Sequence, residues 1–408
     1  MRANGIITGL DIGTTKIGVV VAKCTESGSF RILGIGSAPC EGMKKGAVVD
    51  LEKTVDSIRQ ALDDAENVSG QKIESAYVGI SGEHIKSINS RGVVAIGKAG
   101  TEILPSDVDR VIEAAKAVTI PADREIIHLL PQVFTVDEQG GIKDPIGFTG
   151  ARLEVDVHVV TGSVAAVQNI LKCIEKCGLQ IDELVLEPLA SAYAIVSQGE
   201  MDLGCVVIDM GGTTTDLAVF HEGAIKHTAV VSIGGKNVTS DLAIGLRTPL
   251  EMAEQIKCKY GSALASLVDA SEMITVPGVA GREAKEVSRS VLASIIEPRM
   301  EEIFSLVARE LKKGRLTEAL ASGVVLTGGA SQLHGAAELA EQIFDLPAKL
   351  GAPTSFENFS EINPGPAFAT GVGLIHYALF PMKRETKSKA RGITGRFERI
   401  RRWFSEYF

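Results

Sequence analysis

The hydrophobic pattern of the chain repeats itself at a distance of about half its length. An apolar strand, an aspartate, a glycine with hydroxyl residues and a second β-branched strand follow one another over residues 9–21, and the same order returns over residues 207–219. Two apolar strands that flank a polar, glycine-containing turn are typical of a β-hairpin. The repeat therefore predicts two similar lobes, each opening with a hairpin.

The segment between the two hairpins shows both strand and helix periods. Apolar alternation predicts strands over residues 75–80, 125–136 and 152–160. Apolar residues at helical spacing predict a helix over residues 108–118, started by Pro105 and the two polar residues after it, and another over residues 164–176. The stretch from about residue 82 to 162 is therefore expected to be a small α+β unit inserted into the first lobe.

The second half of the chain continues with longer helical patterns. Helices are predicted over residues 250–260 and 287–311, with a glycine-containing β-hairpin near residues 273–281 between them. An apolar strand at residues 324–327 runs into two glycines, and a helix is expected to open at Ala336. Two prolines and a glycine then lead into a helix of small residues over residues 367–375, which is suited to close packing.

Length and composition limit the class of protein. A chain of 408 residues exceeds what one hydrophobic core usually serves, and 45 % hydrophobic with 23 % charged residues is typical of soluble globular domains. The six cysteines show no paired spacing, so neither a disulfide scaffold nor a zinc site is expected. The chain shows no secretory signal and no apolar window long enough to span a bilayer, which predicts a cytoplasmic location.

The charge is divided unevenly along the chain. The formal net charge is −9, but residues 381–408 carry nine Lys and Arg against three Asp and Glu, so an acidic body ends in a basic tail. Domains dedicated to DNA or RNA neutralise phosphates with clustered basic residues. The acidic body therefore argues against a nucleic acid partner.

Both hairpin turns carry residues that suit a phosphate chain. Such a ligand needs close approach of the backbone, which glycine permits, and N–H and hydroxyl donors. The candidate donors are Gly13, Thr14, Thr15 and Lys16 in the first turn, and Gly211, Gly212, Thr213 and Thr214 in the second. Asp11 and Asp209 precede the turns, where a carboxylate can hold Mg²⁺ through water. One copy alone is equally well explained as a tight turn, but two copies followed by Gly328 and Gly329 favour a phosphate site.

This set of motifs resembles the superfamily of actin, sugar kinases and heat-shock chaperone ATPases. There, two phosphate loops, an adenosine loop and two connecting helices close on ATP between two lobes. The resemblance implies an α/β, actin-like two-lobed ATPase fold with ATP and Mg²⁺ as ligands. By the same resemblance Asp11 and Asp209 serve the metal, the glycines and hydroxyls of both turns together with Lys16 serve the phosphates, and Gly328 and Gly329 pass beneath the adenosine.

Three further residues match superfamily positions. Glu187, before Pro188, resembles the carboxylate that orients the attacking water, and with Asp209 it forms the candidate catalytic pair. A first-turn acid that favours the helix dipole is the alternative explanation. Glu254 and Lys257 match a pair near the ribose and base, although an exposed salt bridge at this spacing is equally consistent. Because phosphoryl transfer depends on precise charge placement, ATP binding is expected with weak ATPase activity at most.

Four segments resemble a narrower group, the FtsA family of actin-like bacterial cell-division proteins, and this resemblance covers essentially the whole chain. The segments are residues 91–96, 108–127, 141–145 and 241–249. The first three lie in the insertion, which resembles the characteristic subdomain 1C of that family. Thr213 departs from the family pattern, in which the second phosphate loop more often has a third glycine. Its side chain would crowd the γ-phosphate or donate to it.

The family resemblance implies a division into subdomains. These are 1A (residues 1–81, 163–200 and 364–382), 1C (82–162), 2A (201–235 and 313–363), 2B (236–312), a flexible linker (383–392) and a membrane-targeting amphipathic helix (393–408).

The family resemblance also implies an adaptor in cell division. Such a protein polymerises on the membrane with nucleotide, tethers FtsZ filaments to the cytoplasmic face of the cell membrane at the septum and recruits later division proteins. Family members bind the C-terminal peptide of FtsZ on subdomain 2B. The basic candidates there are Arg282, Lys285, Arg289 and Arg299, for each of which a solvated helix charge is the simpler explanation.

Two other functions remain open at this stage. A small-molecule kinase of the same fold would need a substrate base and sugar-binding side chains, and no persuasive set is present. A pilus-assembly adaptor of related architecture would have no evident use for a basic aromatic tail.

The tail pattern predicts a membrane-surface helix. Ile393, Phe397, Ile400, Phe404 and Tyr407 recur at helical spacing, and Trp403 widens this apolar face. Arg399 and Arg401 flank it, which suits an anionic membrane surface. From residue 395 to 407 the helix would be about 20 Å long, too short to span a bilayer. A helix docked on the body or on a partner protein is the alternative.

Overall fold

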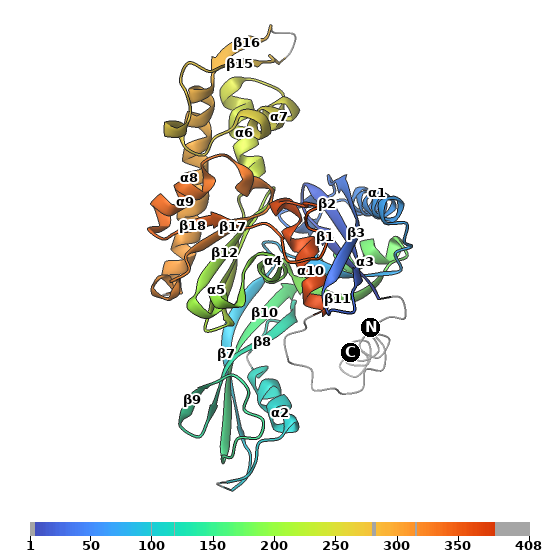
Figure 1. The fold of residues 1–408 in the computed structure, drawn as a ribbon, viewed down its shortest axis with the longest axis vertical. Helices are drawn as coiled ribbons and strands as arrows, with labels where there is room; N and C mark the ends of the chain where they lie inside the picture. Colours follow the sequence, from blue (N-terminus) through green and yellow to red (C-terminus); the bar gives the residue numbers. More distant parts are fainter. Residues whose placement is uncertain (1–4, 99, 118, 280–282, 315, 380–408) are drawn as a thin grey trace.

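The fold is that of a computed structural model, which describes residues 5–98, 100–117, 119–279, 283–314 and 316–379. Two α/β lobes stand side by side, and a smaller α+β unit lies below them in Figure 1. The expected tail helix at residues 393–408 and its linker lie outside the described residues. Within the described part of the chain, no helix is both long and apolar enough to cross a membrane.

The first lobe is built on a five-stranded sheet. Its strand order is β11-β6-β1-β2-β3, with β1 antiparallel to β2 and parallel to β6. The strands are β1 (Ile6–Ile12), β2 (Lys16–Cys24), β3 (Phe30–Pro39), β6 (Ser75–Ile80) and β11 (Gln180–Leu186). Helices α1 (Leu51–Ser69) and α3 (Val164–Lys176) pack on one face of the sheet through a large apolar cluster. The predicted first hairpin, the strand at 75–80 and the helix at 164–176 are confirmed.

The second lobe repeats the same sheet topology. Its order is β14-β13-β12-β17-β18, so each strand has a counterpart in the first lobe with the same neighbours and the same direction of pairing. The strands are β12 (Cys205–Met210), β13 (Thr215–His221), β14 (Ala224–Val231), β17 (Val324–Thr327) and β18 (Ala348–Leu350). The two-lobe prediction from the repeated hairpin is therefore confirmed.

The inserted unit is an antiparallel sheet with one helix. Its order is β7-β10-β8-β9. The elements are β7 (Lys86–Ala95), α2 (Pro105–Ala115), β8 (Arg124–Val136), β9 (Gln139–Ile142) and β10 (Arg152–Ser163). Helix α2 packs on the sheet through Val111 and Ala115, and Gly92 allows its close approach because a Cβ there would lie 2.1 Å from the Val111 carbonyl oxygen. The helix begins at Pro105 as predicted; Val118 lies outside the described residues.

A helical unit extends the second lobe away from the inserted sheet (Figure 1). Its elements are α6 (Gly235–Leu246), α7 (Leu250–Tyr260), β15 (Met273–Val276), β16 (Lys285–Ser288) and α8 (Arg289–Lys313). Two predictions here need correction. Val287 belongs to β16 and not to the following helix, and the partner strand of β15 lies beyond residue 281, because the turn between them is longer than a glycine alone suggests.

The remaining elements connect these units. They are β4 (Met43–Lys44), β5 (Ala47–Val48), α4 (Glu187–Ile195), α5 (Gln198–Leu203), α9 (Ala336–Phe344), α10 (Ala369–Leu379) and short 3₁₀ turns at residues 265–267, 317–319, 329–332 and 366–368. The predicted helix at Ala336 is confirmed. The predicted small-residue helix begins as a 3₁₀ turn and becomes α-helical at Ala369.

Helices α4 and α10 cross between the lobes at very short distance. A Cβ on Gly373 of α10 would lie 1.8 Å from the Ala190 carbonyl oxygen of α4, and a Cβ on Gly9 of β1 would lie 2.5 Å from the Gly371 oxygen. Only glycine leaves room for backbones this close. The small residues of α10 therefore set how near this helix approaches α4 and β1.

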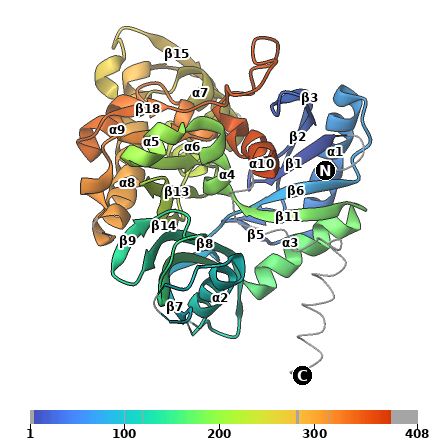
Figure 2. The ribbon, with the colours of Figure 1, turned by 60° about the horizontal axis from the view of Figure 1, so that its bottom comes forward.

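The inserted unit packs against the second lobe as well as the first. Side chains from β7, β8 and β10 meet β14, which is the edge strand of the second sheet. The Asn89 amide donates to the Lys226 carbonyl at 3.2 Å, the Gln132 amide donates to the Ile225 carbonyl at 2.8 Å, and His158 lies 2.9 Å from the Thr228 hydroxyl. These polar side chains cover an edge that would otherwise present unpaired backbone groups. Figure 2 shows the unit beneath both lobes.

We predict that Gly373→Ala destabilises the chain by about 1–3 kcal/mol, because the added methyl group overpacks the crossing of α4 and α10. Chemical denaturation measures the change. Gly199→Ala is the control, since no atom lies within 4 Å of a Cβ at that helical position. It should be neutral or slightly stabilising. Equal midpoints for Gly373→Ala and the unsubstituted chain would contradict the packing argument.

Candidate nucleotide site

A cavity of about 750 Å³ lies between the lobes and collects the candidate residues. Its volume is within the range of small-molecule sites. It is lined by the predicted residues Asp11, Gly13, Thr14, Thr15, Lys16, Glu187, Asp209, Gly211, Gly212, Thr214, Glu254, Lys257, Gly328 and Gly329. Thr213 is the one candidate from the two turns that does not line it.

The two turns have the same backbone geometry. The Gly13 N–H donates to the Lys16 carbonyl at 3.0 Å, and the Gly211 N–H donates to the Thr214 carbonyl at 2.9 Å. The turns also touch each other, since a Cβ on Gly212 would lie 2.2 Å from Cγ2 of Thr15. The repeated sequence motif thus becomes two facing loops at one end of the cavity.

The crossing helices orient Asp209. The Ser191 hydroxyl of α4 donates to its carboxylate at 2.6 Å, and the Thr370 hydroxyl of α10 donates to the same oxygen at 3.4 Å. Gly328 takes a left-handed φ of 84° beside this carboxylate, where a Cβ would lie 2.4 Å from its Oδ1. The position of Asp209 therefore depends on segments from both lobes.

Four carboxyl groups share the buried part of the cavity. They are Asp11, Glu187, Asp209 and Asp216. Loss of solvation, with repulsion from Asp209, raises the pKa of Asp11 to about 6 despite the opposing effect of Lys16. Burial raises the pKa of Asp216 to about 7, with Asp209 adding repulsion while the Ser81 hydroxyl bond lowers it. The pKa values of Glu187 and Asp209 are also raised by burial.

Lys16 supplies the nearest positive charge to this cluster. Its ammonium donates to the Ala367 carbonyl at 2.5 Å and lies 3.5 Å from the centre of the Phe368 ring. Burial lowers its pKa, while Asp11 and Asp209 oppose that effect. Lys16 alone does not offset the repulsion among these carboxyl groups, so the cavity is suited to a further cation.

The described side chains do not form a ready set of direct metal ligands. Within the described ranges, no three His, Cys, Asp or Glu side chains converge as a ready ligand set. An ion there would be held largely through water and ligand oxygens. This is the coordination that Mg²⁺ prefers, because it dehydrates reluctantly.

Glu254 and Lys257 form an ion pair in the wall of the cavity. Their charged atoms lie 2.7 Å apart, and the Lys257 ammonium also donates to the Thr239 hydroxyl at 2.9 Å and the Gly235 carbonyl at 3.2 Å. Lys257 is buried, whereas the Glu254 side chain is 47 % exposed. The two sequence-based explanations therefore coincide: the residues form a salt bridge and also face the cavity.

Sequence reasoning missed several wall residues. Asp216 closes the second turn, where the run Thr-Thr-Thr-Asp offered a signal, since a carboxylate that opens a strand beside a phosphate turn faces the same side as Asp209. Thr370 and Lys236 gave no local signal. Their helices reach the cavity only through tertiary packing.

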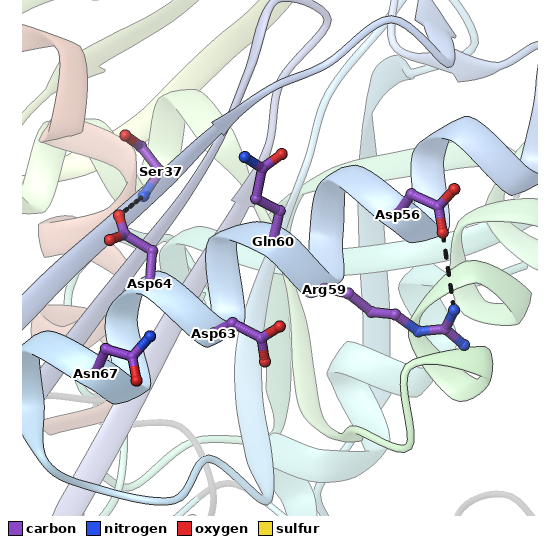
Figure 3. A pocket seen from close by; sticks show the side chains of 7 residues that line it. All are labelled: Ser37, Asp56, Arg59, Gln60, Asp63, Asp64 and Asn67. Atoms are coloured by element: carbon purple, nitrogen blue, oxygen red, sulfur yellow. Dashed lines mark hydrogen bonds and ion pairs between the residues drawn. The ribbon is translucent and has the colours of Figure 1, made fainter.

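A second concavity lies on the outer face of α1, away from the turns. Figure 3 shows its wall, in which the Asp64 carboxylate accepts from the Ser37 N–H at 2.9 Å and Arg59 lies 3.8 Å from Asp56. The other lining residues are Gln60, Asp63 and Asn67. Three aspartates against one arginine would repel a phosphate chain. This groove is therefore not a candidate for the nucleotide.

Comparison with known proteins identifies the family. Residues 206–373 match the family model described as cell division protein FtsA, and residues 82–161 match the SHS2 domain inserted in FtsA. The cell division protein FtsA of Pseudomonas aeruginosa is 45 % identical over 419 aligned residues, covering 100 % of this chain and 99 % of the relative. The chain belongs to the FtsA family. FtsA of Neisseria meningitidis is also 45 % identical, and that of Escherichia coli is 39 % identical over 91 % of this chain and 90 % of its own.

The fold of this chain also resembles solved structures of more distant proteins. The chain resembles a PilM-PilN type IV pilus biogenesis complex with a TM-score of 0.67 at 18 % identity, covering 93 % of this chain and 99 % of that one. MreB5 of Spiroplasma citri bound to ADP gives 0.55 at 15 % identity, covering 94 % and 100 %. At such identities the likeness establishes the actin-like fold alone. The predicted fold is confirmed in the described residues.

Candidate residues outside the cavity have other positions in this chain. Arg299 pairs with Asp241 at 2.5 Å and Arg289 with Glu272 at 2.8 Å, so both guanidinium groups are held within their own unit, while Lys285 is exposed. Arg282 lies outside the described residues, as do the proposed membrane contacts Phe397, Arg399, Ile400, Arg401, Trp403, Phe404 and Tyr407.

We predict that Asp216→Asn stabilises the ligand-free chain at pH 8 by about 1–3 kcal/mol, because it removes one buried charge. A carboxyl whose pKa is raised by folding makes stability fall as pH rises from about 4 to 7. The variant should lose less stability between pH 5 and 8. Thermal unfolding in chelator measures this, and Asp63→Asn on exposed α1 should change stability by less than about 0.5 kcal/mol. An undiminished pH dependence in Asp216→Asn would contradict the assignment.

Proposed function

We propose that this FtsA-family chain binds ATP with Mg²⁺ in the interlobe cavity. The supporting observation is the convergence of two equivalent turns, one from each lobe, on the same cavity as Asp11 and Asp209. Glycine N–H groups and threonine hydroxyls would bind the phosphates there. Gly328 and Gly329 line the cavity beside the Glu254–Lys257 pair and would face the adenosine. MreB5 of Spiroplasma citri, which shares the fold, has been solved with AMPPNP.

Mg²⁺ fits the charge of this cavity. Four buried carboxyl groups with raised pKa values stand against one nearby ammonium, so a divalent cation would relieve repulsion that folding leaves in place. Asp11 and Asp209 would hold the ion, which would neutralise phosphate charge when bound. The site therefore suits the metal complex of ATP better than the free anion.

Hydrolysis is proposed to be weak. Burial and three neighbouring carboxyl groups raise the pKa of Glu187 well above its ordinary value. Burial favours the neutral form of this carboxyl, and a neutral carboxyl is a poorer proton acceptor for an attacking water than a carboxylate. These residues therefore support binding more strongly than rapid turnover.

Asp209→Ala should remove the thermal stabilisation by Mg-ATP. A ligand at about 100 times its Kd stabilises a protein by about 2.7 kcal/mol, and this gain should approach zero in the variant. Differential scanning fluorimetry with and without Mg-ATP measures it. Asp64→Ala, in the α1 groove, is the control and should keep the full shift. A full shift in Asp209→Ala would rule out its role at the metal.

We propose that the chain polymerises through the far end of the inserted unit. Leu104, Ile146 and Phe148 are 53, 44 and 41 % exposed there, on two loops joined by the Ile103 N–H bond to the Phe148 carbonyl at 2.8 Å. Neighbouring apolar side chains at a surface suit a protein contact. A head-to-tail contact of this kind would generate an open filament.

Phe148→Ser should lower the fraction of protein that sediments with Mg-ATP in the absence of vesicles at least severalfold. The apolar contact is lost while the nucleotide cavity is unchanged, so the Mg-ATP thermal shift should persist. Val68→Ser is a matched control, since Val68 is 59 % exposed on α1 in the first lobe. It should sediment normally. Normal sedimentation of Phe148→Ser would place the contact elsewhere.

We propose that the chain tethers FtsZ filaments to the cytoplasmic face of the cell membrane at the septum and recruits later division proteins. The FtsA family membership supports cell division, and the amphipathic pattern of residues 393–408 supports a membrane anchor. The FtsZ C-terminal peptide would bind the helical unit of α6 to α8, in which Ile244 is 77 % exposed.

Trp403 allows a direct test of the anchor, because it is the only tryptophan in the chain. Its emission should shift to the blue on addition of anionic vesicles and less so at high salt or with neutral lipid. Truncation after Gly392 should abolish co-sedimentation with vesicles, and an FtsZ tail peptide should reach the vesicles only with the full chain. Unchanged emission together with co-sedimentation of the truncated chain would remove the anchor from the proposal.

A further inference from the structure

The hydroxyl of Thr213 connects the two lobes at the phosphate end of the cavity. It belongs to the second turn, yet it donates to the Thr14 hydroxyl oxygen of the first turn at 2.9 Å. It also accepts from the backbone N–H of Lys45, in the tight connection between β4 and β5, at 3.2 Å. The side chain is thus directed at the first lobe and not into the cavity.

The direction of this hydrogen-bond chain is fixed at one end. A backbone N–H can only donate, so Thr213 is the acceptor in its bond with Lys45, and the geometry of its hydroxyl makes it the donor in its bond with Thr14. The Thr14 hydroxyl retains one proton to donate. Thr14 lines the cavity, and no acceptor for that proton is found among the described residues. Its free donor is therefore available to a ligand in the cavity.

The Lys45 end is held rigidly. Lys45 has a left-handed φ of 50°, which is uncommon for a residue with a side chain. The Lys45 carbonyl accepts from the Glu83 N–H at 3.1 Å. The next residue, Gly46, packs against Ser81, since a Cβ on Gly46 would lie 2.3 Å from the Ser81 carbonyl oxygen. The backbone that presents the Lys45 N–H is thus set by tertiary contacts.

We propose that Thr213 is a positioning residue that presets the Thr14 hydroxyl as a donor to a phosphate oxygen of the bound nucleotide. This inference rests on the proposed ATP site. Hydrogen bonds in series polarise one another, so the donor strength of Thr14 rises with the chain intact. Thr213 occupies the third position of the second turn, where a glycine would offer no hydroxyl. It thus contributes to the phosphate site without touching the ligand.

The test compares Thr213→Val with Thr213→Ser in the full chain. Valine keeps the branched shape and removes the hydroxyl, whereas serine keeps the hydroxyl. Mg-ATP should bind about 3- to 10-fold more weakly to Thr213→Val, which is the usual net effect of one hydrogen bond, and Thr213→Ser should bind as the unsubstituted chain does. Isothermal titration calorimetry measures the affinities.

Two further measurements separate positioning from general disruption. Adenosine has no phosphate, so in competition with a fluorescent nucleotide it should bind Thr213→Val and the unsubstituted chain equally. The double variant Thr14→Val with Thr213→Val should bind Mg-ATP no more weakly than Thr14→Val alone, because the chain acts through Thr14.

The outcomes distinguish this proposal from the function on which it rests. Failure of the unsubstituted chain to bind Mg-ATP would overturn both. Normal Mg-ATP binding by Thr213→Val, equal loss of adenosine and ATP affinity, or additive effects in the double variant would overturn only the role of Thr213.

Discussion

The near-contact of α4 and α10 is the constraint on which the site depends. Gly373 lies against the Ala190 carbonyl, and this approach places Ser191 and Thr370 within 2.9 Å of each other on either side of Asp209. A larger residue at the crossing would push α4 and α10 apart and move Ser191 or Thr370 away from Asp209. The small side chains of α10 therefore act on function through the distance between backbones, although none of the glycines carries any chemistry.

The meeting of the two lobes also brings buried carboxyl groups close together. Two copies of one hairpin bring Asp11 and Asp209 to the same buried space, and Glu187 and Asp216 add to the charge. In the ligand-free fold, raised pKa values express this repulsion. Duplication of a hairpin thus creates a cavity whose charge favours a metal-bound ligand, while the hydroxyls of Ser191, Thr370 and Ser81 limit the cost to folding.

The local hydrophobic pattern correctly predicted elements whose structure depends on a single segment. The strand at residues 75–80 and the helix at 250–260 have the predicted bounds, because alternation and helical spacing reflect which face of a single element is buried. Prediction failed at Val287, where β15 recruits a partner strand from a segment that reads as helical. Hairpin pairing with β15, in which Ile274 lies opposite Val287, overrode the helical period there. The turn residues of the site were found because the motif repeats, whereas Lys236 and Thr370 were not.

Patterns among neighbouring residues established that there are two equivalent lobes, which residues form the facing turns and that an α+β unit is inserted into the first lobe. Tertiary packing alone places the inserted unit on β14 of the second lobe and directs Thr213 to Thr14 and Lys45. Sequence patterns do not reveal these contacts, because they join residues more than 90 positions apart. Their geometry follows from how close the helices and lobes can approach, which no local spacing records.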